Sequence, residues 1–103
     1  GHPGVALTHG SHPYLPGTSL YFTFVFPRDL DDPVGQWRAA KEAASRAISE
    51  HGGTISHHHG VGTDHAPWIA PELGALGVDV LSAAKERLDP SGIMNPGKLL
   101  PPA

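Results

Sequence analysis

Three consecutive histidines, His57, His58 and His59, lie in the stretch SHHHGVGTDH and have side chains suited to chemistry. An imidazole transfers protons well near neutral pH, and it hydrogen-bonds phosphates and carboxylates. Gly60 and Gly62 follow directly, and glycine lets the backbone come close to a ligand. We interpret the three histidines as a proton-transfer or anion-binding cluster.

A metal site and a plain row of surface histidines are the alternative interpretations of this run. Neighbouring side chains of an extended chain point to opposite sides, so we expect His57 and His59 to share a side that His58 does not. Asp64 is the nearest carboxylate, and the chain contains no cysteine. These features disfavour a metal site, and we assign none.

Tyr21 is a second candidate for chemistry because of its place in the most strand-like stretch, TSLYFTFVF, residues 18–26. This stretch is aromatic and β-branched, and Gly17 and Pro27 bracket it. Side chains alternate between the two faces of a strand, and one face is wholly apolar: Leu20, Phe22, Phe24 and Phe26. We expect that face in the core, with Tyr21 on the other face.

The remaining elements must position these residues. The stretch 31–53 predicts a helix, with Asp31 and Asp32 at its N-cap and two glycines at its end. Residues 54–56 should form a short extended piece leading to the histidines, and Pro67 and Pro71 a loop or one helical turn. A second helix is expected over 77–88, followed by an extended tail without periodicity. Its expected inward positions are Val80, Leu81, Ala84 and Leu88.

The first 17 residues are rich in Gly, Pro and His, and we expect there only a short strand, VALT, without its partners. The order of the elements predicts an α+β fold, with an incomplete antiparallel sheet packed against two helices. The 103 residues suit one domain. With 13 Gly, 11 Pro and only 39% hydrophobic residues, we expect a piece of a larger protein.

The composition also excludes some classes of function. The net charge of −3, with no basic stripe, argues against a nucleic-acid partner. No apolar run approaches the ~18 residues of a membrane span, and no signal peptide is seen. We therefore expect an intracellular protein, cytoplasmic or peripheral at a membrane.

Three stretches together resemble one family: SHPYLPGTSLYFTF, SHHHGVG and LDPSGIMNPGKLL. They are similar to the C-terminal end of FAD-linked oxidases of the vanillyl-alcohol oxidase type, and especially to the alkylglycerone phosphate synthases and their bacterial relatives. The resemblance implies a ferredoxin-like cap domain. Residues 1–89 would form its C-terminal part, and residues 90–103 a tail returning towards an FAD-binding domain that lies outside this sequence.

The resemblance also implies roles for single residues. Tyr21 matches the tyrosine that the synthases use as an acid/base beside the flavin, and the three histidines match their triple histidine. Asn95 and Gly97, in NPGK, match the tail that approaches the cofactor. Two further histidines are candidates for substrate binding. His12 lies with His9 in the stretch THGSHPY, for which a plain polar loop is the alternative interpretation. His65 would partly replace a basic residue that the animal synthases carry where Thr63 stands.

A related branch, the metal-dependent D-2-hydroxyacid dehydrogenases, has a metal-binding histidine and glutamate where Tyr21 and His58 stand here. A phenol and an imidazole suit proton transfer better than binding of a hard cation. The preferred function is therefore exchange of acyl for alkyl on dihydroxyacetone phosphate in ether lipid synthesis, by an enzyme whose other domain binds most of the FAD.

Two alternatives stay open. One is an FAD-linked oxidase or dehydrogenase of a 2-hydroxy acid such as D-lactate or glycolate, and the other is a binding domain without chemistry. The expected partners are the FAD-binding domain of the same protein and a lipid or small-molecule substrate. A homodimer and peripheral membrane association of the full-length protein are left open. We expect the 103 residues to be inactive and to bind no FAD by themselves.

Overall fold

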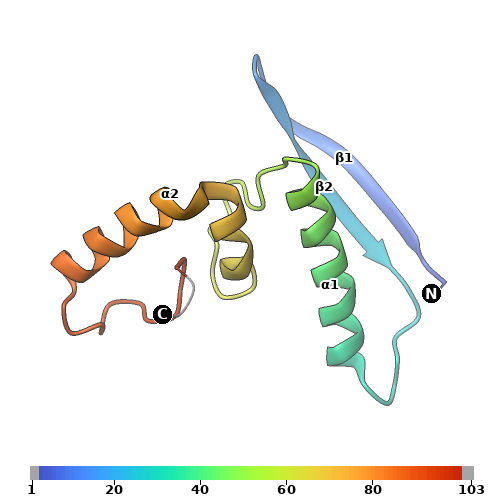
Figure 1. Cartoon of the computed structure of the whole chain (residues 1–103). Coiled ribbons are helices and arrows are strands. Elements are labelled where there is room, and N and C mark those ends of the chain that lie inside the picture. Colours follow the sequence, from blue (N-terminus) through green and yellow to red (C-terminus); the bar gives the residue numbers. More distant parts are fainter. Residues whose placement is uncertain (1–2, 101–103) are drawn as a thin grey trace. The chain divides into compact units, whose positions relative to one another are not determined.

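A computed structural model describes residues 3–100 of the chain. Its elements are two strands and two helices, in the order β1, β2, α1, α2 (Figure 1). The chain divides into two compact units, with the boundary between residues 39 and 40, inside α1. The α+β class and the antiparallel sheet are confirmed. Each unit is described by itself below, and the packing of helices against the sheet stays a prediction.

The first unit is built on a hairpin of β1 (Val5–Tyr14) and β2 (Gly17–Val25). A turn at Leu15 and Pro16 joins the strands, which pair antiparallel from Val5 opposite Val25 to Tyr14 opposite Gly17 (Figure 1). The strand predicted over 18–26 is confirmed with a shift of one residue. The prediction of a short, unpartnered VALT strand is wrong, because β1 extends over ten residues, including part of the Gly- and Pro-rich stretch, and pairs with β2.

The ladder is interrupted once, at His12. The register passes from Ser11 opposite Ser19 to Pro13 opposite Thr18, so that His12 has no opposite residue. His12 has a φ of 49°, in the left-handed region, and the Thr18 hydroxyl donates to the Ser11 carbonyl over 3.0 Å. A bulge leaves one residue out of the pairing, and here it directly precedes Pro13, which has no N–H to give to the ladder.

Helix α1 (Pro33–Glu50) begins as predicted. The Gly35 N–H donates to Asp32 Oδ1 over 2.9 Å, so the Asp32 side chain caps the first turn. Asp29 Oδ1 accepts from the N–H groups of Asp31 and Asp32, over 2.9 and 3.2 Å, and shapes the approach to the helix. The helix ends before Gly52, which has a φ of 74°, as expected for a glycine at this position.

Helix α2 (Ala66–Leu88) is longer than predicted and is broken at Gly74, where φ is 71° and ψ is 168°. The sharp bend is visible in Figure 1. The second part contains the predicted helix 77–88. The stretch around Pro67 and Pro71, predicted as a loop or a single turn, instead belongs to the first helical part. Pro67 lies in the first turn, where its missing N–H needs no partner, whereas Pro71 lies inside the helix.

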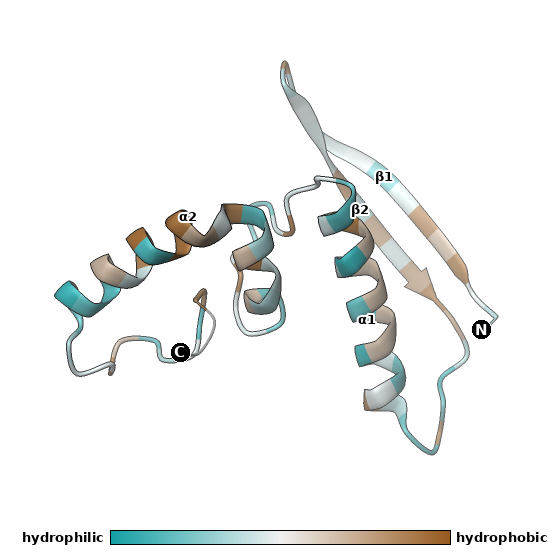
Figure 2. Ribbon diagram, viewed as in Figure 1, coloured by the Kyte–Doolittle hydropathy of each residue, from teal (hydrophilic) through white to brown (hydrophobic). Residues whose placement is uncertain are grey.

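The predicted core positions are largely exposed. Leu20 and Phe22 on β2 expose 55% and 50% of their surface, and Val80 and Leu88 on α2 expose 61% and 79%. A two-stranded sheet has no second layer of its own to cover a face, which explains the exposed strand residues. Figure 2 shows these hydrophobic stretches on the strands and on α2. The buried hydrophobic residues lie in the second unit: Ile55, Ala66 and Ile69.

The tail after α2 contains no helix or strand up to Leu100, as predicted, but it runs through turns and bends rather than straight. Asn95 and Gly97 both have left-handed backbone, with φ of 47° and 70°. Within residues 3–100, neither helix combines the length and the apolar character that a membrane crossing requires.

Candidate functional site

In the first unit, the hairpin places Tyr21 against His9. The two residues are directly opposite each other in the ladder, and Tyr21 is half-buried. Their rings stack with a centroid distance of 4.9 Å and an angle of 5° between the planes. From the sequence, His9 was only a weak candidate beside His12, and its pairing with Tyr21 was not expected because the predicted strand ended at residue 8. A longer strand paired with residues 18–26 would have placed His9 opposite Tyr21, on the same face of the hairpin.

His12 lies in the same hairpin as Tyr21, closer to the turn. Its bulge position breaks the regular alternation of β1, and a bulge redirects side chains relative to the neighbouring strand. The substrate-binding role predicted for His12 remains a prediction. The structure places His12 at a bulge within β1 rather than in a loop.

In the second unit, the histidines follow α1 in an irregular loop. Residues 54–56 form no strand and bend at Ile55. The expectation that His58 points away from His57 is wrong. His58 has a φ of 63°, which turns the chain within the run, and the rings of His57 and His58 stack with centroids 3.9 Å apart and planes 22° apart. A residue other than glycine rarely takes this conformation, and such residues gather at functional sites.

Two side chains hold this loop in place. Glu72 Oε2, from the first part of α2, accepts from the N–H of the buried Ile55 over 2.9 Å. The Ser56 hydroxyl donates to the Gly60 carbonyl over 2.6 Å and closes the loop around the histidines. Glu72 was not identified from the sequence, since nothing in the pattern indicates which carboxylate reaches back to residue 55.

The Gly-Val-Gly turn after the histidines needs both of its glycines. Gly60 and Gly62 have φ of 72° and 60°, and no atom lies within 4 Å of the place where a Cβ would stand on either. The backbone is therefore open on that side, as expected for a ligand approaching it closely. The Leu99 N–H donates to the Gly62 carbonyl over 3.4 Å, so the tail reaches this turn within the same unit.

His65 is half-buried at the residue before α2. Burial lowers the pKa of His65 below 6.5, and the positive charge of Lys41 lowers it further. His59 acts in the same direction, while a hydrogen bond with the Gly60 backbone and the charge of Asp64 oppose the shift. A lowered pKa favours the neutral ring at physiological pH, so His65 is better suited to hydrogen-bonding a ligand than to supplying positive charge.

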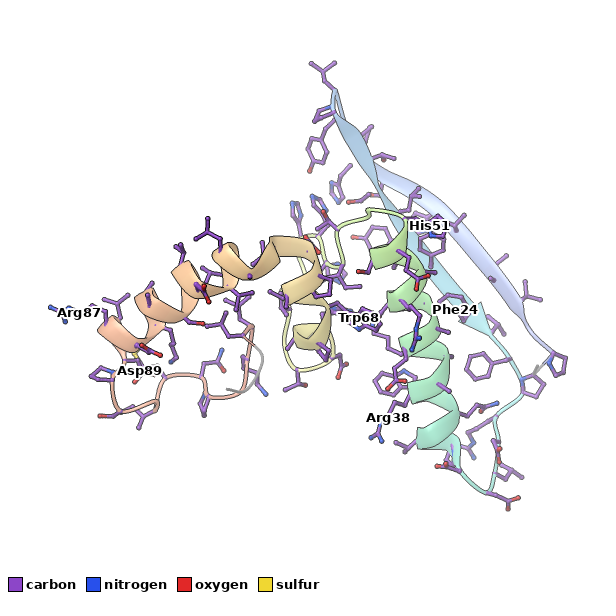
Figure 3. All side chains as sticks on the ribbon, viewed as in Figure 1. Phe24, Arg38, His51, Trp68, Arg87 and Asp89 are labelled. Carbon is purple, nitrogen blue, oxygen red and sulfur yellow. The ribbon has the colours of Figure 1, made fainter. Side chains whose placement is uncertain are left out.

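The start of the tail is fixed by Asp89, a buried carboxylate at the end of α2 (Figure 3). It accepts from Lys85 Nζ and from the N–H groups of Ile93 and Met94, over 3.1 and 2.9 Å. Lys85 Nζ also donates to the Met94 carbonyl over 2.6 Å. The Lys85 ammonium is the main reason that the pKa of Asp89 is lowered below its usual value of 3.8. We call these four residues the tail clamp.

The predicted site residues thus fall into two sets. His57, His58, His59, His65 and the tail turn of Asn95 and Gly97 belong to the second unit, whereas Tyr21 and His12 belong to the first. Their joint action stays a prediction. Over residues 3–100, no three histidine, aspartate or glutamate side chains are grouped so as to hold a metal ion.

His51 directly follows α1 (Figure 3), and its Nδ1 lies 2.8 Å from the Ala47 carbonyl in the last turn of that helix. This contact stabilises the end of the helix.

Comparison with known proteins shows the family to which this chain belongs. Residues 2–99 match the family described as FAD linked oxidases, C-terminal domain. An alkyldihydroxyacetonephosphate synthase of Trypanosoma brucei brucei is 39% identical over 93 residues, which cover 90% of this chain and 15% of that protein. The corresponding synthase of Dictyostelium discoideum is 38% identical over 101 residues, which cover 98% of this chain and 16% of that protein.

A glycolate oxidase subunit of Bacillus subtilis is 40% identical over 72 residues, which cover 70% of this chain and 15% of that protein. The chain thus spans about a sixth of the length of these relatives. No solved structure matches. The match to the family model covers nearly the whole sequence and includes the hairpin, the histidine loop and the tail, and the chain therefore belongs to the FAD-linked oxidases, within their C-terminal domain.

Proposed function

We propose that this chain is the substrate-side segment of an FAD-dependent enzyme resembling the alkyldihydroxyacetonephosphate synthases, which exchanges the acyl group of an acylated dihydroxyacetone phosphate for an alkyl group. The similarity to the Dictyostelium synthase carries this proposal, since it extends over 98% of the chain and so includes both Tyr21 and the three histidines. Residues 1–89 would belong to the cap and residues 90–103 to the tail that returns to the FAD-binding domain.

The exchange requires proton transfer without net oxidation. The incoming alcohol loses its proton and forms a C–O bond, while the C–O bond to the fatty acid breaks and the acid leaves as a carboxylate. Tyr21, half-buried in the hairpin, is our candidate for the general acid/base. The stacked His57 and His58 rings, with centroids 3.9 Å apart, would share the task, because imidazole is a common proton-transfer group.

His59, His65 and His12 would hold the polar head of the substrate. His65 hydrogen-bonds the backbone of Gly60, the residue that follows His59, so the two imidazoles belong to the same loop. The open backbone of Gly60 and Gly62 beside them leaves room for a phosphate or carboxylate group. His12 would act from the hairpin, where the bulge sets it apart from the ladder.

FAD is the cofactor that family membership implies, and most of its binding site would lie in a separate domain of the full-length protein. The turn of Asn95 and Gly97 fits an approach to the cofactor, since both residues are left-handed and nothing lies within 4 Å of the Cβ position of Gly97. When bound, the flavin ring supplies electrophilic and redox chemistry that no side chain provides. This chain would contribute the groups that orient substrate and move protons beside that ring.

A second candidate function is oxidation of a 2-hydroxy acid, favoured by the 40% identity to the glycolate oxidase subunit. The full-length protein distinguishes the two. We expect it to convert an acylated dihydroxyacetone phosphate and a labelled fatty alcohol into labelled ether product and free fatty acid, detected by mass spectrometry. Reduction of an electron-accepting dye by glycolate or D-lactate, with no exchange, would contradict the transferase proposal and support the oxidase.

Homodimerisation and peripheral membrane association of the full-length protein are further proposals. Sedimentation would test the first, and vesicle flotation would test the second.

A further inference from the structure

The stacking of His9 on Tyr21 gives a precise orientation to the side chain that we propose as acid/base. The two residues face each other across the ladder, so their backbones are fixed relative to each other by the pairing of β1 and β2. The rings are 5° from parallel with centroids 4.9 Å apart, which lies in the range of offset-stacked aromatic pairs. A phenol hydroxyl lies in the plane of its ring, and that plane is set here by the imidazole.

We propose that His9 is a positioning residue for Tyr21: its imidazole face holds the phenol ring in the orientation from which the hydroxyl exchanges a proton with the substrate. This inference rests on the proposed function, because it takes the acid/base role of Tyr21 as given. His9 itself would not touch the substrate. Its effect would come from the restricted rotation of the tyrosine ring, since a general acid/base works only within hydrogen-bond reach of the proton that it transfers.

Ordinary sheet stabilisation is the competing explanation, because cross-strand aromatic pairs also stabilise hairpins. The neighbouring cross-strand pair, Thr8 and Phe22, helps to distinguish a positioning role of His9 from a purely stabilising one. Thr8 is opposite Phe22, on the other face of the same hairpin, so a change at Thr8 perturbs the same two strands without reaching the Tyr21 ring. A positioning role predicts loss of turnover specifically at His9, whereas a stabilising role predicts loss of stability at either position.

The test uses the full-length enzyme with His9→Thr, which removes the ring but suits a strand, His9→Phe, which keeps a flat ring, and Thr8→Val as the control. We expect His9→Thr to lower kcat on the order of 10-fold with little change in KM, since small misplacements of a catalytic group are costly. His9→Phe should recover kcat to within about threefold of the parent, as retained stacking implies. Thr8→Val should leave kcat unchanged.

A double-mutant cycle then shows whether His9 acts through Tyr21. In a Tyr21→Phe background, His9→Thr should lower kcat no further, because no hydroxyl remains to be positioned. Normal turnover of His9→Thr, failure of His9→Phe to restore turnover, or an undiminished effect of His9→Thr in the Tyr21→Phe background would overturn the inference while leaving the proposed function intact. Near-normal turnover of Tyr21→Phe alone would overturn both the inference and the acid/base role proposed for Tyr21. Absence of any exchange by the parent enzyme would instead overturn the proposed function.

Discussion

The backbone N–H of Leu99 donates to the Gly62 carbonyl over 3.4 Å, and this bond joins the C-terminal tail to the turn that follows the three histidines. Two parts of the candidate site that are far apart in the sequence thus belong to one unit. The tail clamp holds the other end of the same tail segment at α2. The Asn95–Gly97 turn lies between these two attachments, so its position depends on both.

The first prediction concerns the tail clamp. Asp89→Asn removes the charge that pairs with Lys85, so the turn at Ile93 and Met94 should loosen. We expect the Met94 amide to exchange its hydrogen roughly 5- to 10-fold faster, about the effect of losing one net hydrogen bond. Hydrogen exchange with mass spectrometry measures this. Glu86→Gln, an exposed change on the same helix, is the matched control, and equal protection in both variants would argue against the clamp.

Acid should open the same clamp. The Lys85 ammonium lowers the pKa of Asp89 in the folded chain below 3.8, so the folded state holds the proton less tightly than the unfolded state. The contribution of the clamp to stability is therefore complete above pH 3.8 and is lost as the pH falls from there through the lowered value. The protection of the tail amides from hydrogen exchange can be followed from pH 6 to about pH 2. It should fall within that window for the parent and show no such step for Asp89→Asn.

His65 should titrate below its ordinary value. Burial and the charge of Lys41 lower its pKa from 6.5, so the unfolded state binds the proton more tightly. The stabilisation associated with neutral His65 is therefore complete above pH 6.5 and decreases as the pH falls below that value. NMR of the ring protons should give a midpoint below 6.5, and Lys41→Gln should move it upward. A midpoint at or above 6.5, or no response to Lys41→Gln, contradicts this description.

The histidine loop should depend on Glu72. Glu72→Ala leaves the N–H of buried Ile55 without its acceptor, and we expect the free energy of unfolding to fall by about 1–3 kcal/mol. The stacked pair of His57 and His58 should lose order at the same time, which ring NOEs between them would report. Glu42→Ala, an exposed change on α1, serves as the control. An unchanged unfolding transition for Glu72→Ala would mean that the loop is held by other contacts.

Regular elements were predictable where local signals agreed. The aromatic, β-branched run around Tyr21 gave β2, and the Asp32 cap with Gly52 gave α1. The place of His9 opposite Tyr21 was missed because the glycines and prolines in this stretch disfavour a strand, and pairing with β2 overrides that preference. The stacking of His57 on His58 was not predictable, because it depends on the left-handed backbone of His58 rather than on residue spacing. The exposed Leu20 and Val80 show that amphipathic patterns locate apolar faces without saying what covers them.

The contacts of the tail were likewise not predictable from the sequence. The stretch DPSGIMNPGK indicated the family, and Asp89 was expected only to end a helix. Its three accepted hydrogen bonds come from residues up to five positions away in either direction, a pattern that sequence alone does not distinguish from an ordinary helix end. The sequence thus indicated the histidines and Tyr21 as candidates for chemistry, and their roles stay predictions. The contacts of His9 with Tyr21, of Glu72 with the histidine loop and of Asp89 with the tail emerged from the folded chain.

The central claim is that Tyr21 transfers a proton in an acyl-for-alkyl exchange. Turnover of the full-length Tyr21→Phe enzyme, measured as ether product formed from an acylated dihydroxyacetone phosphate and a labelled fatty alcohol, tests it most directly. We expect a fall in kcat of roughly 10²–10⁴-fold with an unchanged unfolding temperature, as loss of a general acid/base produces. Near-normal product formation by a well-folded Tyr21→Phe enzyme would contradict it.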